Sequence, residues 1–382
     1  MERSYANAAY TLAAQHFVLN ATKKVDCMEK LFSIAVFIVM PAGIKRIPIR
    51  SPHEPQMVFQ PVHKEAPPGS RLPAETYEGR INCHNEGVMK IIKPSVQFYG
   101  TVPTEYNAAL KFIEMAGRTC YKSEDKITED SAEGFVKKLI KAGHLAMVEH
   151  SNFVVRIELT DKQYLSVIIA QVGKYLNIAG SDTAVLYVGG SITAWYNALQ
   201  FVLSIPGVEK DVRMFEPFAS AYINLFGGGY IAKNDWQVCP HDEIPKELHR
   251  YAAKFICDRG VSHELVRHRP CSFAQESTRY VNYGGKDMEF IEPDGFEGWN
   301  VDAKEIFEGS CDFASGAYNN LLHYGELKPQ QARAVLPNAL KTEIVVTTDA
   351  AEWAHIRKLR TAKSAHPDMQ RVMNMMPWEE FL

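Results

Sequence analysis

The sequence predicts a mixed fold of helices and strands, because both kinds of pattern occur along the chain. Apolar side chains at three- and four-residue spacing predict a helix over 131–142, where Phe135, Leu139 and Ile140 form one side. Apolar and polar residues alternate over 153–159, which predicts a half-buried strand. A run of β-branched residues over 342–348 predicts a second strand. These patterns together favour a sheet combined with helices.

Further helices are predicted from caps and periodicity. Thr104 is expected to cap a helix that extends to about residue 118, and Ser131 to cap the helix that Gly143 ends. Asp349 and Glu352 form a capping box for a helix after the second strand. Other helices are expected over 192–203, from about 247 to about 266, over 313–324 and from Pro329 to Pro337, whereas 284–312, rich in glycine and acidic residues, is expected to be a loop.

Composition narrows the class of protein. The 382 residues are 46% apolar and 23% charged, which is ordinary for a globular protein, and the net charge of -3 argues against bulk electrostatic binding of nucleic acid. The seven cysteines form no Cys-x-x-Cys pair, so a zinc ribbon and a thioredoxin motif are excluded, and scattered thiols fit a cytoplasmic protein. The apolar run 31–40 is too short to span a bilayer and is expected to be a buried helix or strand. Neither a nucleic-acid nor a membrane partner is expected.

The segment Glu264–Tyr280, called here the signature segment, is the densest group of functional side chains. An isolated Arg-His-Arg is more often a solvated basic turn. Here it is followed by several side chains that can bind a heterocycle and by a further arginine, whose planar fork matches phosphate oxygens. Pro270 is expected to end the preceding helix, so that the second half of the segment lines a cleft.

Arg360 is the strongest candidate outside the signature segment. It shares a helix side with Trp353, Ile356 and Leu359, and an arginine in an apolar stripe is costly unless it is paired or binds an anion. No convincing pair of nucleophile and base is present, and Cys271 is interpreted as a packing residue.

His144, Glu149 and His150 do not have the spacing of a known metal motif. A corner between a helix and a strand, held by side-chain hydrogen bonds, is the preferred interpretation, and no metal site is predicted.

The signature segment resembles that of the flavin-dependent thymidylate synthases: Arg-His-Arg, two residues, Ser, then Ser-x-Arg-Tyr. Two other stretches are similar to the same family. They are Gly143-His144 followed by Glu149-His150 and Phe153, and Ala332-Arg333 followed by Leu336-Pro337.

The resemblance implies an α+β fold with an antiparallel-rich sheet flanked by long helices. The family-like domain would cover 89–382, with a helical insertion at about 161–248, called here the insertion segment. Residues 1–88 would be an atypical and partly irregular extension, and Met89 a natural or alternative start.

The implied activity is that of a methyltransferase of nucleotide biosynthesis: reductive methylation of dUMP to dTMP. The resemblance implies 5,10-methylenetetrahydrofolate as carbon donor and FAD, reduced by NADPH, as hydride donor. Family members are homotetramers with active sites shared between subunits, which implies the same here.

The resemblance also implies the site residues. Arg360 would be the catalytic group that polarises the uracil ring. The dUMP ligands would be Glu264, Arg267, Gln275, Glu276, Ser277, Thr278, Arg279, Arg333 and Arg360. The FAD ligands would be His144, Ala146, Arg267, His268, Arg269, Gln275, Asp349 and His355.

Three positions depart from the family pattern. Asp349 and Ala274 stand where asparagine is usual, and Ala351 stands where arginine is frequent. Asp349 adds negative charge and Ala351 removes a donor near the flavin, so a catalytically inactive flavin- or nucleotide-binding homologue is an alternative. A binder of single-stranded nucleic acid is a second alternative, which the acidic balance of charge disfavours.

Overall fold

The computed structural model describes residues 89–158, 176–180, 185–204, 215–226 and 237–382. The predictions for 1–88, including the apolar run 31–40 and the start at Met89, lie outside these residues, as do parts of the insertion segment. Among the described helices, none is long and apolar enough to cross a membrane.

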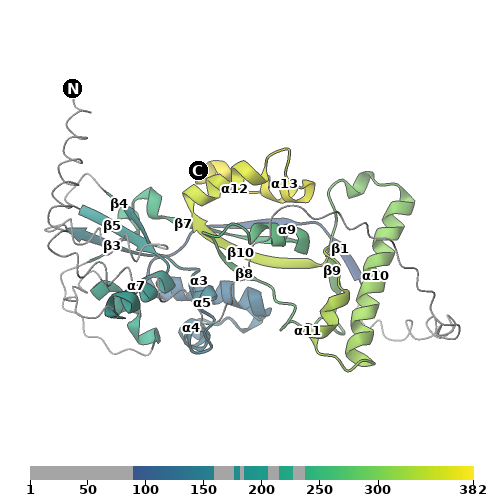
Figure 1. The fold of residues 1–382 in the computed structure, drawn as a ribbon, viewed down its shortest axis with the longest axis horizontal. Helices are drawn as coiled ribbons and strands as arrows, with labels where there is room; N and C mark the ends of the chain where they lie inside the picture. The colour runs from purple at the N-terminus through teal and green to yellow at the C-terminus, as the bar shows by residue number, and fades with distance from the viewer. Residues whose placement is uncertain (1–88, 159–175, 181–184, 205–214, 227–236) are drawn as a thin grey trace, which may run out of the picture. The chain divides into compact units, whose positions relative to one another are not determined.

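The centre of the fold is a four-stranded antiparallel sheet in the order β2-β7-β10-β8 (Figure 1). Its strands are β2 (Ser95–Thr101), β7 (Arg250–Asp258), β10 (Lys341–Asp349) and β8 (Ser272–Gln275). β7 and β10 pair along their whole length, from Asp258 opposite Lys341 to Arg250 opposite Asp349. β10 confirms the strand predicted over 342–348, and the antiparallel sheets with their helices confirm the α+β class.

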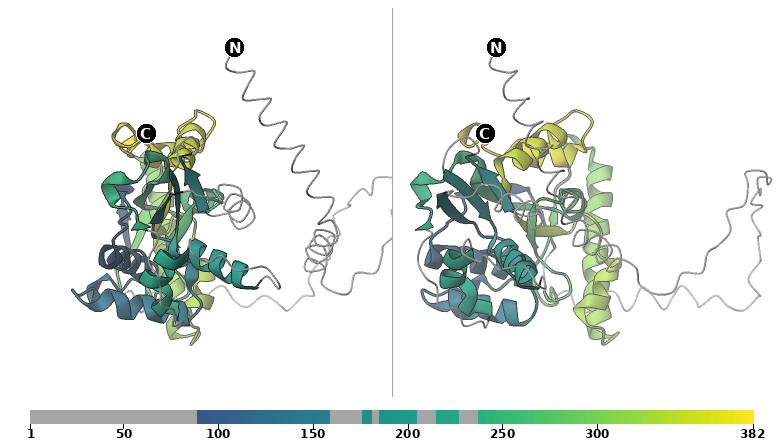
Figure 2. Two further views of the ribbon diagram at one scale, coloured as in Figure 1. Left: turned by 90° about the vertical axis from the view of Figure 1, so that its left-hand side faces the viewer. Right: turned by 60° about the vertical axis from the view of Figure 1, so that its left-hand side comes forward.

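Helices cover both faces of this sheet (Figures 1 and 2). On one face, α9 (Arg259–Leu265), α12 (Ala350–Arg360) and α13 (Pro367–Met373) bury a core that includes Phe255, Ile344 and Trp353. On the other, α3 (Tyr106–Tyr121) and α5 (Leu145–Val148) pack near Ala274 and Val345. The central strands are therefore buried on both sides, which sequence patterns rarely reveal as alternation.

A second antiparallel sheet has the order β4-β5-β3-β6. Its strands are β4 (Leu176–Ala179), β5 (Val185–Gly190), β3 (Phe153–Glu158) and β6 (Gln237–Val238). Around Phe153 pack α4 (Ser131–Lys141), α7 (Ile192–Ser204) and α8 (Glu216–Tyr222), with Trp195 in the centre. β3 and α7 agree with the strand and helix predicted there. The described part of the insertion segment contains strands as well as helices.

A third group joins β1 (Met89–Ile92) in parallel to β9 (Met288–Ile291). It packs with α10 (Val301–His323) and α11 (Pro329–Ala332) around Phe290 and Tyr318. The prediction of a loop over 284–312 is wrong, because this range holds β9 and half of α10. Most of the first half of α10 faces solvent, so this part of the helix is rich in acidic residues, and the sequence pattern does not indicate a helix.

The helix predicted from about 247 to about 266 is wrong over 250–258, which is strand β7, and agrees with α9 over 259–265. Tyr251, Phe255 and Cys257 pack toward α12, while Lys254 points to the other face. With Ala252 and Ala253 both fully buried, the apolar residues run together and imitate a helical stripe. The signature segment therefore follows a strand and a two-turn helix.

The predicted caps had mixed outcomes. The caps at Thr104 and Ser131 are wrong, because Glu105 and Asp130 occupy those positions and neither makes a side-chain cap bond. Asp349 does cap α12, accepting from the Glu352 amide at 2.8 Å, and Gly143 leaves α4 with a φ of 73°. Short 3-10 turns complete the described chain: η2 (Glu124–Lys126), η4 (Ile223–Phe226), η5 (His241–Glu243), η6 (Lys246–Leu248), η7 (Phe296–Gly298), η8 (Arg333–Val335) and η9 (Trp378–Glu380).

Candidate functional site

Arg360 is paired, as an arginine on an apolar helix side should be. At the end of α12 its guanidinium donates to the Glu264 carboxylate at 2.6 Å, to the Glu264 carbonyl at 3.0 Å and to Nε2 of His268 at 3.1 Å. A guanidinium has five N–H donors, so these three bonds leave two for a ligand. The group is half-buried, which strengthens each bond relative to bulk water.

His268 is held in one tautomer. Because Nε2 accepts from Arg360, the proton resides on Nδ1, which donates to Glu352 at 2.9 Å. Burial and the Arg360 charge lower the pKa of His268, against an opposing effect of Glu352. His268 is therefore neutral at pH 7 and leaves the positive charge of Arg360 in place.

His268, Glu352 and His355 are a group of potential metal ligands within the described residues, with ligand atoms inside 4.8 Å of one another. Both His268 nitrogens already hold hydrogen bonds, and the Arg360 cation contacts one of them. A positive neighbour disfavours a metal cation, so the group is better explained by hydrogen bonding.

The predicted corner around residues 144–152 is held by hydrogen bonds. His150 bonds Thr347 at 2.8 Å, and burial, followed by the Arg250 charge, lowers its pKa to about 3. Asn152 donates to the Leu248 carbonyl at 3.0 Å. His144 contacts the Tyr121 hydroxyl instead, so His144 and His150 have different hydrogen-bond partners.

Arg250 binds this corner to the central sheet. It is only partly exposed, and its guanidinium donates to the carbonyls of Glu149 at 2.6 Å and Ser151 at 2.7 Å. It also donates to the Ser272 hydroxyl at 3.0 Å and the Thr347 carbonyl at 3.3 Å. Sequence reasoning missed Arg250, because it was assigned to a helix.

The second half of the signature segment folds inward. Gln275 donates to Ser262 at 2.8 Å and to Thr342 at 3.2 Å, and Arg333 donates to Thr278 at 3.0 Å. The Ser277 amide donates to the Cys120 carbonyl at 3.0 Å. The segment after β8 is thus tied to α3, β10 and η8.

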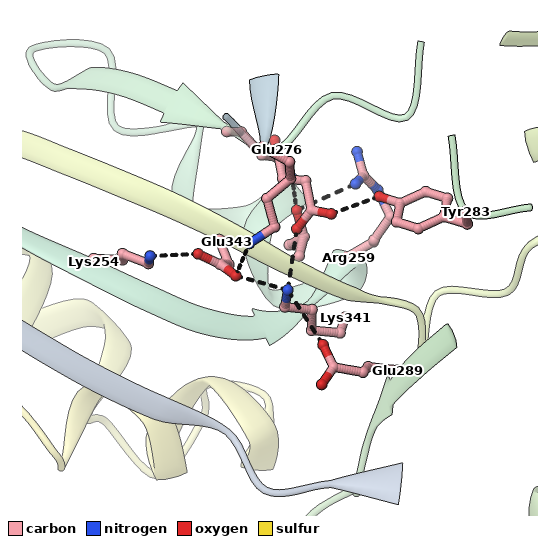
Figure 3. Close-up of polar contacts among 10 residues, drawn as sticks. Lys254, Arg259, Glu276, Tyr283, Glu289, Lys341 and Glu343 are labelled. Carbon is pink, nitrogen blue, oxygen red and sulfur yellow. Dashed lines mark hydrogen bonds and ion pairs between the residues drawn. The ribbon is translucent and has the colours of Figure 1, made fainter. Parts of the chain in front are cut away.

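Glu276 belongs to a buried charge cluster that the sequence did not predict (Figure 3). Its carboxylate accepts from the Tyr283 hydroxyl at 2.8 Å and lies 3.5 Å from Lys341. Lys341 also lies 2.7 Å from Glu343 and 3.4 Å from Glu289. Glu343 is paired further with Lys254 and Lys122. Burial would raise the pKa of Glu343, but the hydrogen bonds from the three lysines outweigh it and lower the pKa to about 2.

A cavity of about 640 Å³ lies between the signature segment and the insertion segment. Arg269, Asp349 and Glu149 line one side, and Asn177, Thr193 and Asn197 line the other. Burial raises the pKa of Glu149, while Arg250 and Ser272 lower it. Two of the expected flavin ligands, Arg269 and Asp349, therefore share one cavity.

The structure brings the expected site residues together in several places. Glu264, His268, Arg360 and His355 lie between α9 and α12, and Gln275, Glu276, Thr278 and Arg333 lie near the start of β10. Asp349 ends β10, eight residues from Lys341, which at the rise of a strand is about 27 Å. Arg267, Arg269, Arg279, Arg333, Ala146 and His355 are exposed.

Cys271 is buried in the core beside α12, and burial raises the pKa of its thiol to about 12. This fits its interpretation as a packing residue. The described cysteines, Cys120, Cys239, Cys257, Cys271 and Cys311, are all free.

The fold and the site define an α+β protein whose exposed arginines and inward-facing polar groups suit a nucleotide. The profile of the family "Thymidylate synthase complementing protein" matches residues 104–166 and 242–381, just over half of the chain. The chain belongs to this family, which confirms the resemblance seen in the sequence.

Two curated relatives are named flavin-dependent thymidylate synthase. The protein of Geobacter sulfurreducens is 37% identical over 107 residues, which are 28% of this chain and 45% of the relative. That of Mycobacterium tuberculosis H37Rv is 36% identical over 128 residues, 30% of this chain and 50% of the relative. The chain thus spans about half the length of the curated relatives it matches.

Among solved structures, a UMP/dUMP methylase PolB from Streptomyces cacaoi, bound with 5-Br dUMP, is similar at 15% identity. The likeness covers 77% of this chain and 93% of that one, with a TM-score of 0.33. A score this low carries no argument about the fold.

Glu343→Gln should destabilise the protein by about 3 kcal/mol at pH 7, because Lys341, Lys254 and Lys122 all lose the buried carboxylate that they share. The folded pKa of Glu343 lies below its ordinary 4.5, so this stability is present above pH 4.5 and is lost as the pH falls toward 2. Urea unfolding between pH 7 and pH 3 should show the difference between variant and wild type shrinking.

The control is Glu133→Gln, which breaks the exposed pair with Lys137 and should leave the free energy of unfolding nearly unchanged, because solvent screens such a pair. A difference for Glu343→Gln that stays constant over this pH range would contradict the assignment of the lowered pKa.

Proposed function

We propose that the chain methylates dUMP reductively to dTMP, with 5,10-methylenetetrahydrofolate as carbon donor and FAD, reduced by NADPH, as hydride donor. The observation that carries this proposal is the arrangement of Arg360. It is fixed by Glu264 and by a neutral His268 and keeps two N–H donors for a ligand. The family match, which includes the signature segment and Arg360, supports the same activity.

Arg360 would donate to a carbonyl of the uracil ring. Its charge would stabilise negative charge that develops on the ring, and a preorganised donor does this without reorganisation during the reaction. Glu264 orients the guanidinium and His268, being neutral, does not compete for the developing charge.

The phosphate of dUMP calls for cations that reach solvent. Arg267, Arg279 and Arg333 are exposed and can supply bidentate donors. Thr278 fixes Arg333 at 3.0 Å, and Ser277 lies in the same loop. Gln275 and Glu276, also expected at dUMP, are bonded to Ser262, Thr342 and Tyr283, so in this conformation they support the loop.

The residues expected at FAD fit such a group in their chemistry. Arg267 and Arg269 are exposed cations suited to a pyrophosphate, and Arg269 and Asp349 line a cavity of ligand size. The proposed set is completed by His144, Ala146, His268, Gln275 and His355. When bound and reduced, the flavin supplies the hydride.

We also propose a homotetramer with shared active sites, because the site residues of one chain lie in separate groups. Ile306 and Phe313, seven residues apart on α10, are 70% and 59% exposed and lie on one helix side. Exposed apolar side chains in a row are typical of a protein interface.

The domain organisation is proposed as expected from the sequence: an extension over 1–88 and a synthase domain over 89–382 with an insertion. The family match omits 167–241, which supports the insertion. The free cysteines support a cytoplasmic location.

A catalytically inactive flavin-binding homologue is the second candidate. The observation that favours it is the pair of departures at the start of α12, where Asp349 carries a negative charge and Ala351 no donor.

Tritium release from 5-tritiated dUMP is the direct test. Release should require FAD, NADPH and methylenetetrahydrofolate together, because the carbon and the hydride come from different reagents. Omission of each component is the control. Bound flavin without release would favour the inactive homologue, and release without flavin would refute the proposed mechanism.

Arg360→Ala should lower turnover by roughly 100-fold or more while changing flavin affinity little, because one preorganised donor is typically worth that much in the transition state. Stopped assays of dTMP and flavin titration would measure the two effects. Arg357→Ala is the matched control, since Arg357 lies on the same helix and pairs with Glu379. Wild-type turnover in Arg360→Ala would remove Arg360 from the mechanism.

Phe313→Asp should shift the protein from a tetramer to smaller species, because a carboxylate in an apolar contact must be desolvated. Size-exclusion chromatography with light scattering would measure the mass. Ile127→Asp is the control, because Ile127 is also an exposed apolar residue but lies in a different segment. An unchanged tetramer would show that this side of α10 is not an interface.

A further inference from the structure

The cavity of about 640 Å³ has two walls of different origin. One comes from the part that the family profile matches and includes Arg269 and Asp349. The other comes from the insertion segment and includes Asn177, Thr193 and Asn197. The volume is within the range of small-molecule sites. No residue of the second wall can be assigned by comparison with the family, because the profile does not cover it.

The insertion wall is joined firmly to the family-like part at the start of α7. The Ile192 amide donates to the Ser151 hydroxyl at 3.0 Å, and the Thr193 hydroxyl donates to the Leu145 carbonyl at 3.3 Å. The Ser191 hydroxyl accepts from the Ala194 amide at 3.1 Å. Asn197, four residues after Thr193, lies on the same side of the helix and therefore faces the cavity.

The side chain of Asn177 contacts the opposite wall at the rim of the cavity. Its side-chain nitrogen donates to Oδ2 of Asp349 at 3.2 Å, while Oδ1 of Asp349 accepts from the Glu352 amide at 2.8 Å. Asp349 is thus shared between the cap of α12 and the insertion segment. Asn177 and Asn197 are both exposed at the rim, so their amides can meet a ligand.

The lining is balanced in charge. The lining holds two carboxylates, Glu149 and Asp349, and two guanidinium groups, Arg250 and Arg269, and its other residues contribute mainly amides, hydroxyls and apolar atoms. Arg250 already makes four hydrogen bonds within the protein. Such a wall suits an uncharged ring with alternating acceptors and donors better than a phosphate. The imide edge of a flavin ring, with one N–H between two carbonyls, has this pattern.

We propose that Asn177 and Asn197 form a second wall of the flavin site and hydrogen-bond the imide edge of the flavin ring. This inference rests on the proposed function, because it takes FAD as the cofactor. The uracil ring of dUMP has the same edge, so the test must separate the two ligands.

The test is titration of the purified full-length chain with FAD, followed by flavin fluorescence, for Asn177→Ala and Asn197→Ala. Loss of one hydrogen bond to a ring should raise the Kd about 5- to 10-fold. FMN has the same ring without the adenosine part, so its Kd should rise by the same factor. dUMP, titrated calorimetrically, should bind the variants as it binds wild type.

Gln200→Ala is the matched control, because Gln200 is exposed on α7 and is not among the residues that line the cavity. Circular dichroism and thermal unfolding of each variant verify that the fold is kept. A variant that loses flavin affinity together with its fold is replaced by Asn177→Leu or Asn197→Leu, which keep a similar side-chain volume, carry no charge and remove the amide. The same rise in Kd is expected.

Three results would overturn the inference. In the first, the wild type binds FAD and methylates dUMP, and the variants bind FAD as tightly as the wild type. This result would remove Asn177 and Asn197 from the site and leave the proposed function intact. A weaker affinity for dUMP alone would assign the imide contact to uracil. A wild type that binds no flavin would refute both this inference and the flavin part of the proposed function.

Discussion

The Arg250 guanidinium is the contact on which the two sheets depend. Arg250 is the first residue of β7 in the central sheet, and its guanidinium can only donate hydrogen bonds. The acceptors are the carbonyls of Glu149 and Ser151 in the corner before β3, the Ser272 hydroxyl in β8 and the Thr347 carbonyl in β10. Removing a guanidinium from water is costly unless it is fully paired, and a cation deep in the protein therefore fixes its neighbours strongly. Arg250 also lines the cavity, together with residues of the same corner and of β8 and β10.

A second chain of polar contacts fixes the candidate catalytic arginine. Asp349 caps α12 through the Glu352 amide, Glu352 accepts from His268, and His268 accepts from Arg360. Each bond selects one tautomer or one orientation of the next group. The charge of Arg360 remains available because the histidine that contacts it is neutral, whereas a protonated His268 would repel the guanidinium. Local capping, a tautomer and an electrostatic role are thus coupled through four side chains.

Local patterns in the sequence predicted much of the fold, including β3, β10, α7 and the cap at Asp349. They failed where tertiary structure overrides local pattern. In β7, Ala252 and Ala253 are buried on opposite faces, so no alternation remains to be read. The first half of α10 is exposed and needs no apolar side. Its acidic residues and glycine therefore show no helical pattern in the sequence. Nothing in the local sequence around Lys341 and Glu343 predicts the buried charge cluster, because only the fold brings Lys254, Lys122 and Glu276 to them.

The residues of the candidate site were predicted by family motifs, but motifs do not reveal how such residues are supported. Asp349 is the clearest case. As a departure from asparagine it argued for weak flavin binding, since it exchanges an amide for a charge. In the structure the Asn177 amide lies 3.2 Å from Asp349, and Arg250 is close enough to interact with its charge. Asn177, from the insertion segment, therefore brings an amide next to the position at which the family pattern has one. The hydrogen bond between Asn177 and Asp349 thus joins the insertion segment to the position that departs from the family pattern. This weakens the argument from Asp349 for an inactive homologue. That alternative then depends on Ala351 alone.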